Sequence, residues 1–152
     1  CGVCGGSGIP DGYAFNSHTD ECAPGEFLHN SSTQQAAYFF NNVTLDGELI
    51  GPDDWVGAFN GDICVGSRKW DTSQCGGGMC DVPVLGFDDD LTSGYMLSGQ
   101  YPSFKIFDSL NEIYVDAYAS QEIAWFPFGT PIFDSLSECP GGASNCYKED
   151  KK

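Results

Sequence analysis

Apolar and polar residues alternate with a period of two along much of the chain, which predicts short β-strands joined by turns. The pattern is strongest between residues 55 and 65, where two short apolar runs are separated by Asn60-Gly61. Asn and Gly best tolerate the positive φ angles of both central residues in a type I′ turn. This stretch therefore predicts a β-hairpin, around which we expect the rest of the domain to form.

Further apolar segments bounded by turn residues predict strands at 35–43, 48–50, 81–85, 95–97, 104–107 and 113–119, with 125–128 and 132–133 closing the domain. Asp46-Gly47 supplies a turn after the first of them. Pro83 suits an edge strand, because proline has no N–H to donate to a ladder. Few residues follow a helical period. The pattern therefore predicts an all-β fold, an antiparallel β-sandwich of the Ig-like or jelly-roll-like kind.

We expect three parts in this chain of 152 residues: a Cys/Gly-rich linker at 1–26, the β-sandwich domain at 27–138 and a Cys-containing tail at 139–152. The linker is too rich in Gly, Pro and Cys for a helix or a long strand. No initiator Met, signal peptide or apolar run of membrane length is present. We therefore interpret the sequence as a mature chain or an excerpt, without membrane insertion.

The charge balance narrows the choice of partners. With 22 acidic residues against 6 basic ones, the formal net charge is −16. A phosphate backbone requires a basic face, so nucleic acid is excluded as a partner and anionic membranes are disfavoured. The acids either form a solvated surface or include ligands of a hard cation.

Three successive carboxylates, Asp88, Asp89 and Asp90, are the clearest candidate for such ligands. Neighbouring carboxylates repel each other unless water or a cation separates them, and Ca²⁺ accepts an oxygen-rich loop. The spacing is not that of an EF-hand. The sequence therefore leaves two interpretations open: a solvated acidic loop, or a calcium site for which Asp53 and Asp54 are further candidate ligands.

The chain has 8 cysteines, an even number that predicts disulfides and an extracellular or cell-surface location. Cys75 and Cys80 enclose a tight Gly-rich loop and predict a local bridge. The connectivity of the others stays open; they are Cys1, Cys4, Cys22, Cys64, Cys139 and Cys146. Two sequons, at Asn30 and Asn42, predict glycosylation in such a location.

Two stretches resemble known secreted modules. CGVCGGSGIPDG at the start resembles Cys/Gly repeats akin to thrombospondin type 3 repeats, in which acidic side chains bind calcium; Ser7 stands where the usual pattern has Asp. DWVGAFNGDICVG at 54–66, followed by FKIFD at 104–108, resembles a β-sandwich module repeated in secreted proteins of marine bacteria and some protists. This second resemblance covers about residues 36–136. It implies surface or matrix architecture, without assigned catalytic residues.

The residues offer no catalytic constellation that sequence spacing can identify. The two histidines, His18 and His29, lie before the predicted domain core, and no Ser or Cys has the context of a nucleophile. The glycines at 76–78 lack the Lys-Ser/Thr ending of a phosphate-binding loop. We therefore expect a protein that is not an enzyme.

The leading hypothesis is a structural subunit of an extracellular assembly, such as a filament, surface appendage or matrix. Its partners would be copies of itself, joined through the edges of the sandwich and the Cys-rich leader. The alternative is a calcium-dependent carbohydrate-binding or adhesion module, with glycans stacked on Trp70, Tyr95 or Tyr101.

Overall fold

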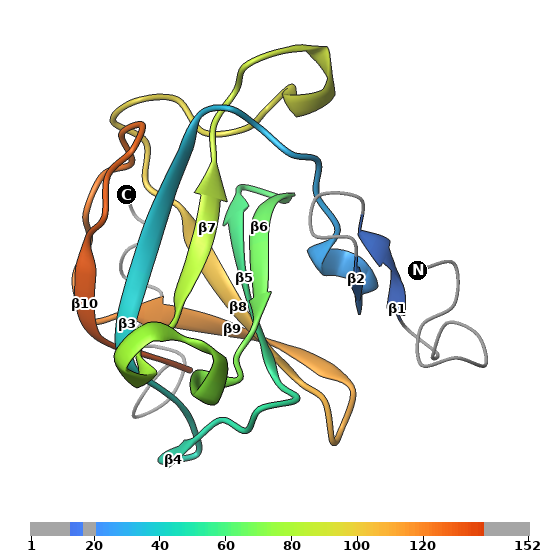
Figure 1. Ribbon diagram of the computed structural model, residues 1–152, viewed down its shortest axis with the longest axis vertical. Coiled ribbons are helices and arrows are strands. Elements are labelled where there is room, and N and C mark those ends of the chain that lie inside the picture. Colours follow the sequence, from blue (N-terminus) through green and yellow to red (C-terminus); the bar gives the residue numbers. More distant parts are fainter. Residues whose placement is uncertain (1–12, 17–20, 139–152) are drawn as a thin grey trace.

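The computed structural model describes residues 13–16 and 21–138, which form strands and short 3₁₀ turns (Figure 1). Cys1, Cys4, Cys139 and Cys146, and the repeat-like stretch 1–12, lie outside these residues. The strands are β1 (Tyr13–Asn16), β2 (Glu21–Pro24), β3 (Gln35–Leu45), β4 (Glu48–Leu49), β5 (Trp55–Asn60), β6 (Ile63–Lys69), β7 (Asp81–Leu85), β8 (Ser103–Asp108), β9 (Ile113–Ala119) and β10 (Ile132–Ser137). The 3₁₀ turns are η2 (Gly25–Phe27), η3 (Thr72–Gln74), η4 (Gly76–Gly78) and η5 (Asp90–Thr92). Within these ranges no helix is both long and apolar enough to cross a membrane.

One curled sheet dominates the fold. Its strands follow the order β4-β3-β10-β9-β8-β5-β6, with β7 paired to β3 beside β4, while β1 and β2 form a separate hairpin. The pairings are antiparallel except between β10 and β3. Only Leu136 and Ser137 of β10 register with β9, and at this short joint the sheet turns into a half-barrel. The prediction of an all-β, mostly antiparallel fold is confirmed, and its two halves are joined in one sheet.

A first apolar core lies between the two halves of the half-barrel. Both halves contribute to it, Val56 and Ile106 from one and Phe40 and Phe133 from the other. The rings of Phe40 and Phe133 stack with their centroids 5.1 Å apart. Apolar burial of this kind is the main favourable term in folding, and paired rings add about 1 kcal/mol each.

A second, smaller core lies on the outer face of β5. Trp55 and Phe59 point into it, whereas Val56 and Ala58 of the same strand point into the first core. Phe27 of η2 is fully buried there, and its ring occupies the space where a Cβ on residue 57 would stand, 2.6 Å away. Gly57 therefore makes room for Phe27, whose burial contributes about 2 kcal/mol. Residues of the predicted linker, Ala23 among them, thus pack as part of the domain.

The central hairpin forms one residue later than the sequence suggested. Asn60 pairs with Ile63, so the two turn residues are Gly61 and Asp62, and of these Gly61 alone has a positive φ, +64°. The prediction of a type I′ turn centred on Asn60-Gly61 is therefore wrong, because Asn60 stays in the ladder. A register shift after Ala58 accompanies this arrangement. By contrast, Asp46 and Gly47 both have positive φ, 53° and 82°, and form the tight turn between β3 and β4.

Two other predicted strands differ from the structure. Residues 95–97 form no strand, since Met96 makes a single parallel bridge to Gly86. Residues 125–128 form no strand either. The N–H of Phe128 donates to Gln35 O of β3 at 2.6 Å, whereas the backbone N–H of Trp125 donates to Gln100 O at 2.7 Å. The side chain of Trp125 is buried in the core, where its Nε1 donates a hydrogen bond to Val84 O at 2.8 Å.

The half-barrel closes where β6 meets β7. A Cβ on residue 66 would lie 1.7 Å from the carbonyl oxygen of Pro83, so the two backbones touch at Gly66. β7 pairs with β3, in agreement with the edge position expected for Pro83. Arg68 joins the same two strands a second time, because its Nε donates to Asp81 O. Closure therefore depends on a glycine contact and one side-chain bridge.

We expect Gly66→Ala to destabilise the fold by about 3 kcal/mol, because a methyl group cannot enter a backbone contact without moving β7. Chemical denaturation monitored by tryptophan fluorescence would measure this loss. Gly76→Ala is the control, since a Cβ there meets nothing within 4 Å, and we expect a change within about 0.5 kcal/mol. Equal effects of the two substitutions would contradict closure at Gly66.

Candidate functional site

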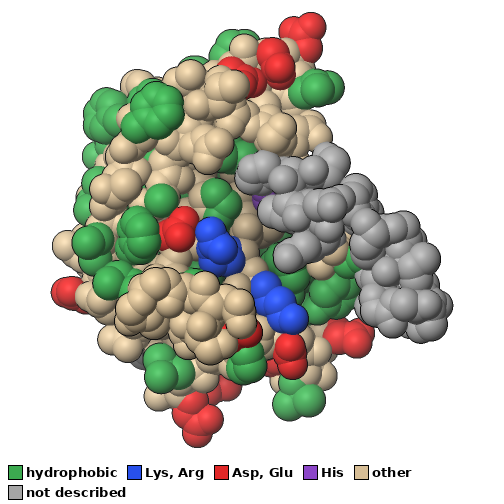
Figure 2. Space-filling view, in the orientation of Figure 1, with side chains coloured by type: hydrophobic (Ala, Val, Ile, Leu, Met, Phe, Trp, Pro, Cys, Tyr) green, Lys and Arg blue, Asp and Glu red, His purple; other side chains and the backbone are tan. Residues whose placement is uncertain are grey.

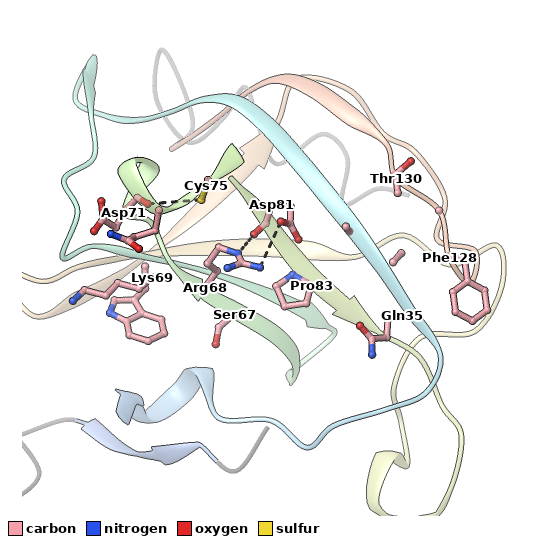
Figure 3. Close-up of a pocket in the computed structure, with 15 residues that line it drawn as sticks. Gln35, Ser67, Arg68, Lys69, Asp71, Cys75, Asp81, Pro83, Phe128 and Thr130 are labelled. Carbon is pink, nitrogen blue, oxygen red and sulfur yellow. Dashed lines mark hydrogen bonds and ion pairs between the residues drawn. The ribbon is translucent and has the colours of Figure 1, made fainter. Parts of the chain in front are cut away.

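One concave site in the described part of the chain is an open groove of about 1000 Å³ that crosses the outside of β6, β7 and β3 (Figure 3). We call it the β6–β7 groove. It includes the contact between β6 and β7 described above, with Lys69 toward one end and Phe128 and Thr130 at the other. Trp55 also lines it. Its further lining residues are Gln35, Ala36, Ala37, Ser67, Arg68, Asp71, Gln74, Cys75, Asp81, Pro83 and Gly129.

Basic side chains are concentrated at this groove. The Lys and Arg residues in the described part are Arg68, Lys69 and Lys105, and the first two line the groove. Figure 2 shows blue side chains in the middle of this face and most of the red ones toward its periphery. The whole chain carries a net charge of −16, whereas the groove lining contains two bases and two acids, Asp71 and Asp81.

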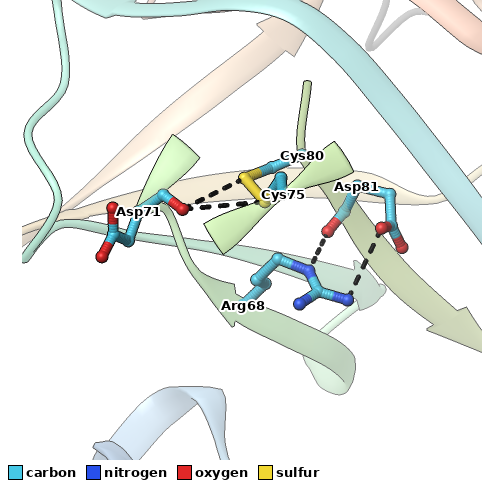
Figure 4. Close-up of polar contacts among 5 residues, drawn as sticks. All are labelled: Arg68, Asp71, Cys75, Cys80 and Asp81. Atoms are coloured by element: carbon cyan, nitrogen blue, oxygen red, sulfur yellow. Dashed lines mark hydrogen bonds and ion pairs between the residues drawn. A yellow bond between two sulfur atoms is a disulfide. The ribbon is translucent and has the colours of Figure 1, made fainter. Parts of the chain in front are cut away.

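Both cations have acidic neighbours at the surface. The guanidinium of Arg68 bridges the carbonyl and carboxylate of Asp81, with Nη2 3.5 Å from Oδ1 (Figure 4). Lys69 Nζ lies 3.5 Å from a carboxylate oxygen of Asp53. Exposed pairs of this kind contribute little to stability, and an incoming anionic group can replace either acid. The groove thus suits an extended chain that brings carboxylates and apolar groups together.

The predicted disulfide between Cys75 and Cys80 is confirmed, and it shapes one rim of the groove. Both sulfur atoms lie 3.7 Å from the carbonyl oxygen of Asp71, whose carboxylate accepts from Ser73 N–H at 3.2 Å and so begins η3 (Figure 4). The bridge closes a loop with little apolar content and holds it beside Arg68. This rim is therefore rigid.

The groove offers binding groups more readily than reacting ones. Its lining contains no histidine, and the hydroxyl of Ser67 is buried and donates to Phe27 O at 3.1 Å. Arg68 and Lys69 were not among the predicted site residues, although adjacent bases in so acidic a chain were a usable signal. Phe128 belongs to the aromatic segment 125–128, for which the sequence allowed either contacts between copies or ordinary core packing.

Phe128 stands out because its backbone is strained and its side chain is exposed. Its φ is +66°, and 72% of the residue is accessible to solvent. A left-handed conformation costs a bulky residue about 1 kcal/mol or more, and glycine avoids this cost. The hydrogen bond from its N–H to Gln35 O holds this geometry. An aromatic ring is therefore kept in water, next to the groove, at a cost in stability.

The acidic loop predicted to hold calcium is organised by hydrogen bonds. Asp88 Oδ2 accepts from the N–H and hydroxyl of Thr33 at 2.7 and 2.9 Å, and its Oδ1 accepts from the buried Thr92 hydroxyl at 2.9 Å. Asp89 caps η5 by accepting from Leu91 N–H. These bonds lower the pKa of Asp88, chiefly through Thr33.

Asp54 has a comparable role at the start of β5. One carboxylate oxygen accepts from Gly51 N–H at 2.7 Å, and the other accepts from the N–H and hydroxyl of Ser109, both at 2.9 Å. It thereby ties the turn before β5 to the turn after β8. No group of three or more His, Cys, Asp or Glu in the described ranges is placed to hold a metal ion. Calcium binding by the five predicted ligands stays a prediction; they are Asp53, Asp54, Asp88, Asp89 and Asp90.

The three residues predicted to stack on sugars do not form one surface. Trp70 is 3% exposed and packs near Phe40, and Tyr95 is 5% exposed with its hydroxyl accepting from Asn30 N–H at 2.8 Å. The stacking prediction is wrong for both, because neither ring presents a face to solvent. Tyr101 is 58% exposed and lines a separate, smaller pocket.

The predicted modification sites differ in their surroundings. Asn30 and Asn42 are both exposed, as glycosylation requires, although the amide of Asn30 donates to Leu91 O at 2.8 Å. Cys22 is disulfide-bonded. Cys64 is a buried free thiol in the second core, so its predicted disulfide is wrong: its side chain faces Phe27 and Phe59 in the interior.

Comparison with protein-family models, with curated proteins and with solved structures found no match. The resemblances described from the sequence therefore rest on their motifs. The structure adds that the two motif segments are neighbours, since Trp55 of β5 registers with Phe107 of β8.

We expect Asp88→Asn to open the loop at 87–92 and to change the pH dependence of stability. The folded-state pKa of Asp88 is lowered, so the charged carboxylate stabilises the fold above its unfolded pKa of about 4, and this contribution is lost as pH falls through the folded pKa. Urea unfolding of both proteins between neutral and acidic pH would show their difference shrinking in acid.

Asp134→Asn is the control for Asp88→Asn, because this exposed carboxylate has no hydrogen-bond or ion-pair partner among the described residues. A constant difference between wild type and Asp88→Asn at every pH would contradict the role of the charge.

We expect Cys64 to resist alkylation in the native protein. Burial raises the pKa of its thiol to about 12, and the thiolate is the reactive form. Treatment with iodoacetamide at mildly alkaline pH, followed by peptide mass spectrometry, should label Cys64 only after unfolding in urea. Labelling at equal rates with and without urea would show that the second core is open to solvent.

Proposed function

We propose that this protein is a non-catalytic subunit of an extracellular assembly that associates with its own copies through the face carrying Phe128 and the β6–β7 groove. The observation that carries the proposal is the exposed, strained position of Phe128. Strained residues persist where the surrounding structure holds them for a purpose, and an exposed aromatic ring gains most by being covered.

The surroundings of Phe128 support a protein contact. Phe126 and Ile132, in the same segment, are each more than half exposed. The groove beside them contains the basic groups Arg68 and Lys69, which can attract the acidic surface of another copy, since the chain has a net charge of −16. The ring of Phe128 and the β6–β7 groove lie on the same face of the molecule. Two copies related by a two-fold axis can therefore each place Phe128 in the groove of the other.

Growth beyond a pair requires a second contact away from the groove. Among the described strands, β4 stands at one end of the strand order and pairs only with β3, and an end strand of this kind can accept a strand from a neighbour. The extracellular location is supported by the Cys75–Cys80 bridge and the exposed sequons. The finer assignment to an Ig-like or jelly-roll-like sandwich belongs to the same proposal.

Phe128→Gly separates association from folding. Glycine adopts φ of +66° without strain, so we expect the unfolding free energy of the monomer to stay within about 1 kcal/mol of wild type, while association weakens at least tenfold. Sedimentation velocity of unreduced protein over a range of concentrations measures association, and electron microscopy shows whether ordered filaments form.

The matched control is Glu112→Gly, which relieves a similar strain, φ +58°, at an exposed polar residue in the turn between β8 and β9. We expect its association to equal that of wild type. A wild-type protein that stays monomeric at every concentration, or a Phe128→Gly variant that assembles normally, would refute the proposal.

A further inference from the structure

A second concave site is rich in aromatic side chains, which make up five of its twelve lining residues. This pocket of about 280 Å³ lies where β8, β9 and β10 meet the loop at 120–124, and we call it the Tyr101 pocket. Tyr38, Phe104 and Phe133 are buried side chains that form its floor, and Tyr101 stands exposed in its wall. Its volume is at the lower end for small-molecule sites, so it suits a small ligand or one side chain.

Hydrogen bonds tie the two walls of the pocket together. The hydroxyl of Tyr38 donates to Ile123 O at 3.1 Å, which fixes the loop carrying Glu122 to the aromatic floor. The backbone N–H of Trp125 donates to Gln100 O at 2.7 Å, so the residue before Tyr101 is held next to the end of the same loop. The pocket is therefore formed before any ligand arrives, which lowers the entropy lost on binding.

The electrostatics of the pocket are one-sided. No Lys, Arg or His lines it, and it contains one carboxylate, that of Glu122. Within the described ranges Glu122 has neither an ion-pair nor a hydrogen-bond partner, and it is exposed. The net charge of −16 adds a field that attracts cations. The exposed ring of Tyr101 and a carboxylate without an ion-pair partner, lining the same pocket, are groups that bind organic cations.

We propose that the Tyr101 pocket binds an alkylammonium group, either a small free amine or quaternary ammonium compound or the side chain of a lysine in a partner peptide. The cation would lie against the ring of Tyr101, with Glu122 balancing its charge. This activity is independent of self-association, because the pocket and the β6–β7 groove share no residue.

A neutral sugar fits the pocket less well. Sugar hydroxyls need several converging donors and acceptors, but the side-chain oxygen of Gln121 already accepts from Ser120 Oγ at 3.0 Å and from Asp134 N–H at 3.4 Å. A single exposed ring and one carboxylate leave most hydroxyls unpaired. Glycan binding is therefore an outcome that the experiment must be able to detect.

Titration of the ¹⁵N-labelled chain, followed by amide chemical shifts, tests the proposal at weak affinity. The probes are choline, its neutral isostere 3,3-dimethylbutan-1-ol, Nα-acetyl-lysinamide and methyl glucoside. We expect saturable shifts at Tyr101, Ala119 and Ile123 with choline, at least tenfold weaker binding of the isostere, and weaker binding of choline at high salt. The lysine probe decides between a free ammonium compound and a peptide side chain as the better ligand.

Two variants assign the binding groups. Tyr101→Leu keeps an apolar side chain but removes the ring, and we expect a five- to tenfold loss of choline affinity; Glu122→Gln should cost about threefold and remove most of the salt dependence. Phe87→Leu and Glu48→Gln are the matched controls, because both residues are exposed and neither lines the pocket or the β6–β7 groove. No saturable shift, equal binding of the isostere, or preferential binding of the glucoside would overturn the proposal.

Discussion

The fold depends on the burial of β5 on both faces. Val56 and Ala58 are packed in the core of the half-barrel, while Trp55 and Phe59 need a second cover, which η2 and the β1–β2 hairpin provide. Phe27 lies over Gly57 as part of that cover. Exposure of the outer face of β5 to water would cost the free energy that its burial contributes to folding. The residues before the main sheet are therefore held against that face. The hairpin at β5 and β6 therefore organises two cores instead of one.

Carboxylates do much of the structural work in this acidic chain. Asp54, Asp88 and Asp108 each accept backbone N–H groups and hold turns that have little apolar content. Turns of this kind leave backbone donors unpaired, and a charged acceptor satisfies them well. The acids that most resembled metal ligands in the sequence are thereby engaged at least in part by the protein itself. The remaining charge surrounds two sites of different character, a groove with two cations and an aromatic pocket with none.

Local strain and surface function coincide at Phe128. The same segment buries Trp125 through its indole hydrogen bond and exposes the rings on either side of Pro127. Since Trp125 and the backbone bond to Gln35 hold the segment at both ends, the intervening residues have few conformations left. The strain is thus a consequence of anchoring, and the exposed ring is what the proposed contact between copies would use.

The sequence by itself determined the all-β class, most strand positions and the Cys75–Cys80 bridge, because alternation, turn residues and short loop closure are local properties. It placed the Asn60-Gly61 turn one residue early and expected a strand at 95–97, where ladder register and core packing overrode local preference. Tertiary structure alone decided that Trp70, Tyr95 and Cys64 are interior, that β10 runs parallel to β3, and that distant residues line the groove and the Tyr101 pocket. Burial and site geometry depend on contacts between segments far apart in the chain, and no spacing within one segment records them.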